Sequence, residues 1–312
     1  MKRVATIYYN ISFLLLCFVV GMMDVVHAQN ASSGLQEILL PSVSTGDSNS
    51  VVADSNAIAD DFVWPATVGE IYVPDGFVRH DVDSNSFAAY LRGLPLRPKG
   101  CRVLDYLGRK GWASDYAHAV INMDIGSVDL QQCADAVIRL RAEWLYGLKR
   151  YDDIVFHFTN RFSCPYRRWA DGDRVYVSGG SKAGWSHRAK RNYSYECFRD
   201  YLEMVFTYAG TMSLDYDARK VAYSDMQIGD FFLCPGRPGH AILVGDMVEN
   251  PSTGEKLFLV LESNTPAADI HVLGVDSDDT TTPWYSLSQL LRYGFIDFPT
   301  YSFCEDNLRR FK

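Results

Sequence analysis

The sequence lacks the residue spacings that bind metal ions in most zinc proteins. Its seven cysteines include no Cys-x-x-Cys pair, and its seven histidines form neither a His-Glu-x-x-His nor a His-x-x-Glu-His motif. Zinc ribbons, zinc fingers and zinc hydrolases depend on such spacings. A structural zinc site and a metal hydrolase are therefore disfavoured, and we expect no cofactor.

An excess of positive charge is also missing. Thirty Lys and Arg stand against 38 Asp and Glu, which gives a formal net charge of −8, and no run of basic residues forms a stripe. Proteins that bind nucleic acid neutralise phosphates with such basic surfaces. The composition therefore argues against a nucleic-acid partner.

A hydrophobic run long enough to span a membrane is absent as well. Lys2 and Arg3 precede the apolar segment Ile11–Met23, and Ala28 ends a plausible cleavage site. This order is typical of a secretory signal, and the run is shorter than the roughly 20 residues of a membrane-spanning helix. We predict a signal peptide at residues 1–28 and a protein exported to the periplasm, the cell envelope or the exterior. An uncleaved N-terminal anchor is the alternative.

The remaining chain divides by composition into a linker and a domain. Residues 29–61 are rich in Ser, Asn, Asp and Gly, which predicts a flexible linker. Residues 62–312 alternate helical and strand patterns, and 47% of the whole chain is hydrophobic. We predict a single α+β domain in which two main helices pack on an antiparallel sheet. The basic tail after Phe303 is expected to fray.

The first of these helices, 129–150, contains a cysteine in its first turn. Asp129 is a suitable N-cap, and Gln132 three residues later completes a capping box. The apolar residues that follow recur at helical spacing, and they are Leu130, Cys133, Val137, Leu140, Trp144 and Leu145. The helix N-terminus favours a thiolate at Cys133. The alternative is that Cys133 is only a buried structural cysteine.

The second main helix, Tyr195–Ala209, follows the capping residue Ser194. Cys197 lies in its first turn, and we interpret it as structural.

A three-stranded antiparallel meander is predicted between residues 228 and 264. Its strands are Phe231–Cys234, Ala241–Val244 and Lys256–Leu261, separated by turns rich in Pro and Gly. His240 lies at the start of the second strand, and Glu262 and Asn264 follow the third.

The order Cys133, Gly229-Asp230, Gly239-His240 and then Glu262 or Asn264 resembles the papain-like peptidases and amidases, particularly the NlpC and CHAP groups. The resemblance implies a papain-like core with Cys133 as nucleophile, His240 as general base, and Asn264 or Glu262 orienting the imidazole. Gln132, just before the nucleophile, would help to stabilise the oxyanion. The sequence around Cys133, LQQCADA, departs from the usual pattern of these families.

The function implied is an exported cysteine hydrolase that cleaves amide bonds in peptides or in the peptidoglycan of the cell wall. No cofactor takes part in such chemistry.

A longer resemblance covers the chain from about residue 62 to its end. The strings DLQQCADAVIRLRAEWLY, SYECFRDYLEMVFTYAGT, GDFFLCPGRPGHAILVGD and PWY are similar to an uncharacterised family of secreted bacterial proteins, the domain of unknown function DUF4846. This resemblance implies one contiguous exported domain and no particular activity.

The alternative function is a non-catalytic cell-envelope or carbohydrate-binding module. Residues 160–192 are polar, aromatic and rich in glycine, which predicts a long loop-rich insertion. In this interpretation Trp169, Trp185 and the pair Arg167/Arg168 form the contact surface, while Cys133 and His240 are merely buried.

Overall fold

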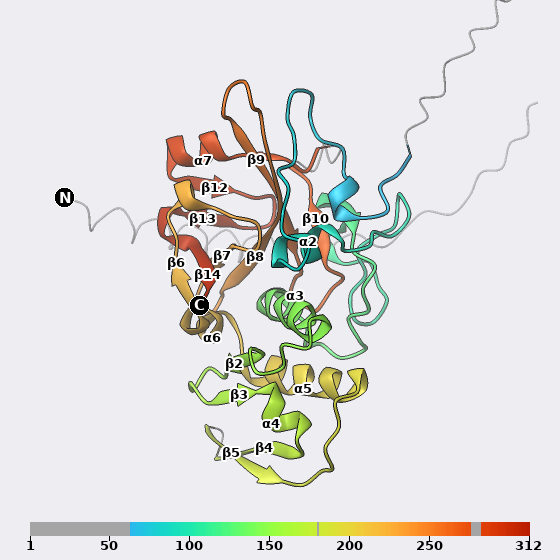
Figure 1. Ribbon diagram of the computed structural model, residues 1–312, viewed down its shortest axis with the longest axis vertical. Helices are drawn as coiled ribbons and strands as arrows, with labels where there is room; N and C mark the ends of the chain where they lie inside the picture. Colours follow the sequence, from blue (N-terminus) through green and yellow to red (C-terminus); the bar gives the residue numbers. More distant parts are fainter. Residues whose placement is uncertain (1–62, 180, 276–281) are drawn as a thin grey trace, which may run out of the picture. The chain divides into compact units, whose positions relative to one another are not determined.

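An eight-stranded antiparallel sheet forms the centre of the computed structural model, which describes residues 63–179, 181–275 and 282–312 (Figure 1). The predicted signal peptide and linker lie outside these residues. The strands are β1 (Ala117–Val120), β6 (Ala218–Lys220), β7 (Phe231–Cys234), β8 (His240–Glu249), β9 (Lys256–Glu262), β10 (His271–Leu273), β11 (Tyr285–Ser286) and β14 (Leu308–Phe311). Their order is β1-β10-β9-β8-β7-β14-β6, and β11 pairs additionally with β9. The predicted α+β class and antiparallel sheet are confirmed.

The meander β7–β8–β9 is apolar because both of its faces are covered. Leu243 and Leu261 belong to the core cluster on one face, whereas Ile242 and Val260 belong to the cluster on the other. Alternate residues of a strand point to opposite faces, so a strand buried on both sides is apolar throughout.

Six α-helices accompany the sheet in the described residues. They are α2 (Phe87–Arg92), α3 (Cys133–Gly147), α4 (Tyr166–Ala170), α5 (Tyr195–Tyr208), α6 (Thr211–Asp217) and α7 (Leu287–Tyr293). Short 3-10 helices cover Val68–Glu70, Trp112–Tyr116, Tyr223–Asp225 and Glu305–Asn307.

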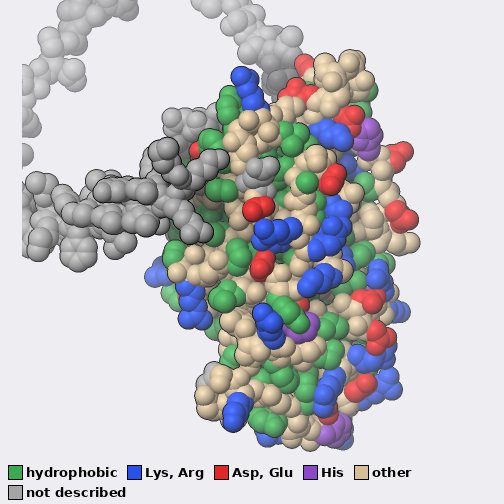
Figure 2. All heavy atoms as spheres, turned by 90° about the vertical axis from the view of Figure 1, so that its left-hand side faces the viewer, with side chains coloured by type: hydrophobic (Ala, Val, Ile, Leu, Met, Phe, Trp, Pro, Cys, Tyr) green, Lys and Arg blue, Asp and Glu red, His purple; other side chains and the backbone are tan. Residues whose placement is uncertain are grey.

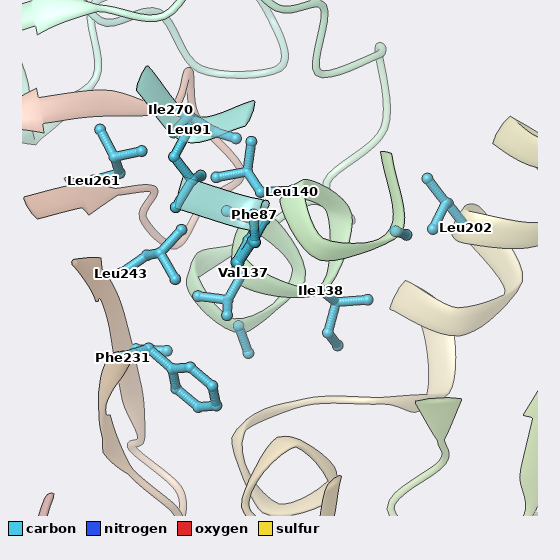
Figure 3. Packing of buried hydrophobic residues seen from close by; sticks show 14 of the residues in the cluster. Phe87, Leu91, Val137, Ile138, Leu140, Leu202, Phe231, Leu243, Leu261 and Ile270 are labelled. Carbon is cyan, nitrogen blue, oxygen red and sulfur yellow. The ribbon is translucent and has the colours of Figure 1, made fainter. Parts of the chain in front are cut away.

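Helix α3 is buried on two sides. Figure 3 shows Val137 on the side facing Leu243 of the sheet, while Ile138 points toward Leu202 of α5. All four side chains are almost completely buried. Helix α5 therefore lies on the side of α3 that faces away from the sheet, and α3 is the one of the two main helices in contact with the sheet strand β8 (Figure 1). The prediction of the two helices themselves was close, and Ser194 caps α5 as expected.

Three two-stranded hairpins complete the fold. They are β2 (Val155–His157) with β3 (Ser163–Pro165), β4 (Asp173–Ser178) with β5 (Lys182–His187), and β12 (Phe295–Asp297) with β13 (Ser302–Cys304). The segment 160–192 thus contains a helix and three strands, and the prediction of a loop-rich insertion was wrong. Val175 pairs with Trp185 across β4 and β5, so cross-strand packing outweighs the polar composition.

The C-terminal tail was also mispredicted, because β14 is an interior strand between β7 and β6. Leu308 is fully buried, and Arg310 bonds the buried carboxylate of Asp230 at 2.5 and 2.7 Å. Arg310 is thus the partner of a buried acid rather than the sign of a solvated end. Among the described residues, no helix combines the length and apolar character needed to cross a bilayer.

Candidate active site

Cys133 is the first residue of α3, closer to the helix terminus than the sequence suggested. The N-cap is Gln132 rather than Asp129, and the Gln132 backbone N–H donates to the Asp135 carboxylate at 3.1 Å. The Asp129 carboxylate instead accepts hydrogen bonds from the Gln132 side chain and from the backbone N–H of Ala267. The predicted helix start was therefore three residues too early. The N–H groups of the first turn, which have no acceptor within the helix, surround Cys133.

His240 is the first residue of β8, where the β7–β8 turn approaches α6. The turn passes so closely that a Cβ on Gly239 would lie 2.5 Å from the Thr211 hydroxyl and 2.7 Å from the Gly236 carbonyl oxygen. Only glycine fits this position without displacing its neighbours. The tight turn thus places His240, which is 9% exposed, at the start of β8.

The imidazole of His240 links a thiol to a carboxylate. Its Nε2 lies 2.5 Å from Glu262 Oε1, and the Cys133 side chain lies close enough to the ring to influence its protonation. Burial alone would lower the pKa of His240, but Cys133 and Glu262 beside the ring raise it to about 9. The carboxylate accepts at Nε2, so Nδ1 is the ring nitrogen left for the thiol.

Glu262, the last residue of β9, is the carboxylate that holds this histidine. It is 1% exposed, and its Oε1 also accepts a hydrogen bond from the Thr300 hydroxyl at 2.8 Å. Burial tends to raise its pKa, but the hydrogen bond with His240 and the nearby imidazole of His271 lower it to about 2. Of the two orienting residues expected from the sequence, Glu262 contacts His240. The amide of Asn264 is buried without a hydrogen-bond partner in the described part of the chain.

Cys133 and His240 line one cleft of about 600 Å³. The cleft is formed by segments that are distant in the sequence, namely Trp112, 129–135 at the start of α3, 206–212 between α5 and α6, the turn 236–240, Thr265 and 300–301. A thiol and an imidazole thus lie at one cavity large enough for a small molecule, and the buried Glu262 carboxylate contacts the imidazole from within the domain.

A family model described as domain of unknown function (4846) matches residues 68–310. The chain belongs to this family. No curated protein and no solved structure matches the chain. The family domain covers all of the residues just described, including Cys133, His240 and Glu262.

Gln132, the expected oxyanion donor, lies at the edge of the cleft of this family domain. Its side-chain Nε2 donates to Asp129 Oδ1 at 3.1 Å, and its Oε1 accepts from the Thr265 hydroxyl at 3.1 Å. These bonds fix the amide beside the nucleophile. The neighbouring Gln131 is buried and bonds Arg139, so it does not take part in the cleft.

Three residues of the site were missed from the sequence. The Tyr301 ring lies over the His240 imidazole with 4.9 Å between ring centres, Thr300 bonds Glu262, and His271 pairs with Glu262 across β10 and β9. His271 Nε2 lies 3.5 Å from Glu262 Oε2. The short segment around His271 that follows Glu262 in the sequence was a usable signal, whereas nothing local marked Thr300 and Tyr301.

The residues proposed for a binding module lie elsewhere. Trp169 is 5% exposed beneath Arg174, so it cannot provide a contact surface, and that expectation was wrong. Arg167 and Arg168 form ion pairs with Asp152 and Asp173, and Trp185 packs partly buried against Phe162.

No group of three or more His, Cys, Asp or Glu side chains in the described ranges could hold a metal ion. The six cysteines after the predicted signal peptide are all free thiols. On the face shown in Figure 2, basic and acidic side chains are interspersed.

Proposed function

We propose that this protein is an exported cysteine hydrolase that cleaves an amide bond in a peptide or cell-wall substrate. The observation that carries the proposal is that Cys133 and His240 lie together in the wall of one cleft and that the buried Glu262 carboxylate bonds His240. A papain-like core belongs to the same proposal, supported by the order of a cysteine helix followed by an antiparallel sheet.

The residues have complementary roles in the proposed reaction. The Cys133 thiolate attacks the carbonyl carbon, and the resulting oxyanion accepts hydrogen bonds from the Cys133 backbone N–H and the Gln132 amide. The tetrahedral intermediate collapses with cleavage of the C–N bond, and the His240 imidazolium gives its proton to the departing amine. His240 then removes a proton from water, which attacks the thioester and releases the acid and the Cys133 thiol.

The low pKa of Glu262 makes these reaction steps possible. Because it stays ionised, it can only accept a hydrogen bond, which fixes the hydrogen on His240 Nε2 and leaves Nδ1 to exchange a proton with the thiol. The same charge stabilises the imidazolium that must protonate the leaving group.

Alkylation of the thiols by iodoacetamide at pH 7, followed by mass spectrometry of each cysteine peptide, tests the pairing. We expect Cys133 to be labelled in the wild type and to lose at least about tenfold in rate in His240→Ala, as for other nucleophiles that depend on a base. Cys164 is the matched control in the same molecule, because burial raises its pKa to about 12 and it has no such partner.

Two further readouts make the test decisive. The exposed Cys101 and Cys304 should be labelled equally in both proteins, and Glu262→Gln should slow Cys133 as well. Peptide and peptidoglycan digests should show new amide cleavage products with the wild type and none with Cys133→Ala. A Cys133 that is as unreactive as Cys164, or indifferent to His240, would overturn the proposal.

A further inference from the structure

The indole of Trp112 differs from the other tryptophan side chains of the domain because no ring or cation lies against it. Five of the six tryptophans of the chain contact an aromatic ring or an arginine, and these are Trp64, Trp144, Trp169, Trp185 and Trp284. In the described part of the chain, Trp112 has no such contact and is 51% exposed. Tryptophan is highly buried on average, so this exposure is unusual.

The exposed indole lies in the wall of the cleft, near the nucleophile. Its Nε1–H donates to the Thr265 carbonyl oxygen at 3.3 Å, and the Thr265 hydroxyl donates to Gln132 Oε1 at 3.1 Å. Gln132 immediately precedes Cys133, and both line the same cleft as Trp112. Two hydrogen bonds therefore connect the indole to the residue before the nucleophile.

The backbone around Trp112 is held in place on both sides. Gly111 donates its N–H to the Val103 carbonyl oxygen at 2.8 Å, and Ala113 is 1% exposed. A contact surface that is already fixed loses little conformational freedom when a ligand binds. The indole is therefore a preorganised contact surface within the cleft.

The polar groups beside the indole indicate which ligand fits. The Gln132 amide nitrogen bonds Asp129, and its oxygen bonds Thr265, so these three side chains are already bonded to one another. A sugar needs hydrogen-bond partners for its hydroxyl groups, whereas an aromatic side chain needs only an apolar face to stack on. The surroundings of Trp112 therefore favour an aromatic side chain over a sugar ring.

We propose that Trp112 binds an aromatic side chain of the substrate, and that the site prefers peptide amides with an aromatic residue close to the scissile bond. This inference rests on the proposed function of Cys133. An aromatic ring stacked on the indole would cover the apolar surface that the protein leaves exposed, and the fixed position of the indole would make the contact selective.

Neutral thiol reagents that differ by one ring test this preference without knowledge of the substrate. Benzyl methanethiosulfonate would be compared with methyl methanethiosulfonate. In each case the thiolate attacks the sulfenyl sulfur, a mixed disulfide forms and methanesulfinate leaves. The ratio of the benzyl rate to the methyl rate would be measured at Cys133 and, as an internal reference, at Cys304, an exposed thiol that does not line the cleft.

We expect the benzyl-to-methyl ratio at Cys133 to exceed that at Cys304 by about tenfold, the upper range for one aromatic pair. In Trp112→Ala the ratio should fall to that of Cys304, whereas Trp112→Phe, which keeps a ring, should stay within about threefold of the wild type. Met212→Ala is the matched control, because it removes a 53% exposed apolar side chain from the same cleft but no ring. It should change the ratio by less than about twofold.

A second measurement uses the wild type alone, in case Trp112→Ala does not fold. N-acetylphenylalaninamide should protect Cys133 from iodoacetamide at concentrations where N-acetylglycinamide and N-acetylglucosamine do not. The three compounds share an N-acetyl group, and they differ in the group that would meet the indole.

The outcomes separate this inference from the proposed function. A ratio at Cys133 equal to that at Cys304, equal losses of the ratio in Trp112→Ala and Met212→Ala, or better protection by the sugar would overturn the role of Trp112. Dependence of the methyl rate on His240 judges the nucleophile independently of these ratios. A Cys133 that reacts with neither reagent would overturn the proposed function itself.

Discussion

At the scale of single residues, the site is defined by buried groups whose charges compensate each other. His240 would lose its proton on burial if it stood alone, and Glu262 would gain one. Together they hold each other ionised, and Thr300 and His271 occupy the other sides of the carboxylate. The neighbouring Asp135 has no such compensation.

The mutual ionisation of His240 and Glu262 predicts a pH-dependent stability. The pKa of His240 rises from 6.5 to about 9 on folding, so its contribution is complete below pH 6.5 and is lost as the pH rises through 9. The pKa of Glu262 falls from 4.5 to about 2, so its contribution is present above pH 4.5 and is lost as the pH falls through 2. Both contributions are therefore complete between pH 4.5 and 6.5.

Urea unfolding of the wild type and of the double variant His240→Asn/Glu262→Gln measures this contribution, because the double variant lacks both titrating groups. The wild type should exceed the double variant in the free energy of unfolding, and this difference should shrink by at most about 3 kcal/mol between pH 6.5 and 9.5. His187→Asn, which removes an exposed histidine paired with Asp173, should leave the pH dependence unchanged. A difference that stays constant over this range would contradict the mutual ionisation.

At the scale of elements, local patterns located the helices and the meander but not their precise contacts in space. The start of α3 was misplaced because the Asp129 carboxylate bonds Ala267, a residue 138 positions away. His240 contacts Glu262 rather than Asn264, although the two residues are two positions apart and strand alternation alone does not distinguish them. Such long-range pairings leave little trace in a local sequence window.

The interior position of β14 predicts that its buried side chains contribute strongly to the stability of the domain. Leu308→Ala removes a fully buried side chain that packs in the cluster of Phe232, Phe258 and Phe303. We expect a loss of about 2–5 kcal/mol in the free energy of unfolding, as for other large-to-small changes in cores.

Leu291→Ala makes the same chemical change in α7 at a residue that is 51% exposed. It should lower the free energy of unfolding by no more than about 0.5 kcal/mol. Urea denaturation measures both variants. Equal losses in the free energy of unfolding would contradict the interior position of β14 and favour the frayed tail that the composition predicts.

At the scale of the whole molecule, α3 connects two layers that would otherwise be separate. The sheet covers one side of the helix and α5 covers the other, within a single core cluster (Figure 3). The cleft also depends on both layers, because its walls include the β7–β8 turn and the segment between α5 and α6. Displacing either layer would expose α3 and separate the residues around Cys133. We therefore infer that the domain unfolds in one step and that the site is lost in that step.

Leu243→Ala on the sheet side and Leu202→Ala on the α5 side test this cooperativity. Each should lower the stability by about 2–5 kcal/mol. In each variant the urea midpoints from far-UV circular dichroism, from tryptophan fluorescence and from exposure of the buried thiol of Cys164 to alkylation should coincide. If Leu202→Ala exposed Cys164, which is buried near α5, while the circular dichroism of the sheet was unchanged, the two layers would be independent units. A single midpoint would mean that the sheet and α5 unfold together because both pack on α3. The surroundings of Cys133, at the start of α3, would then be lost in the same step.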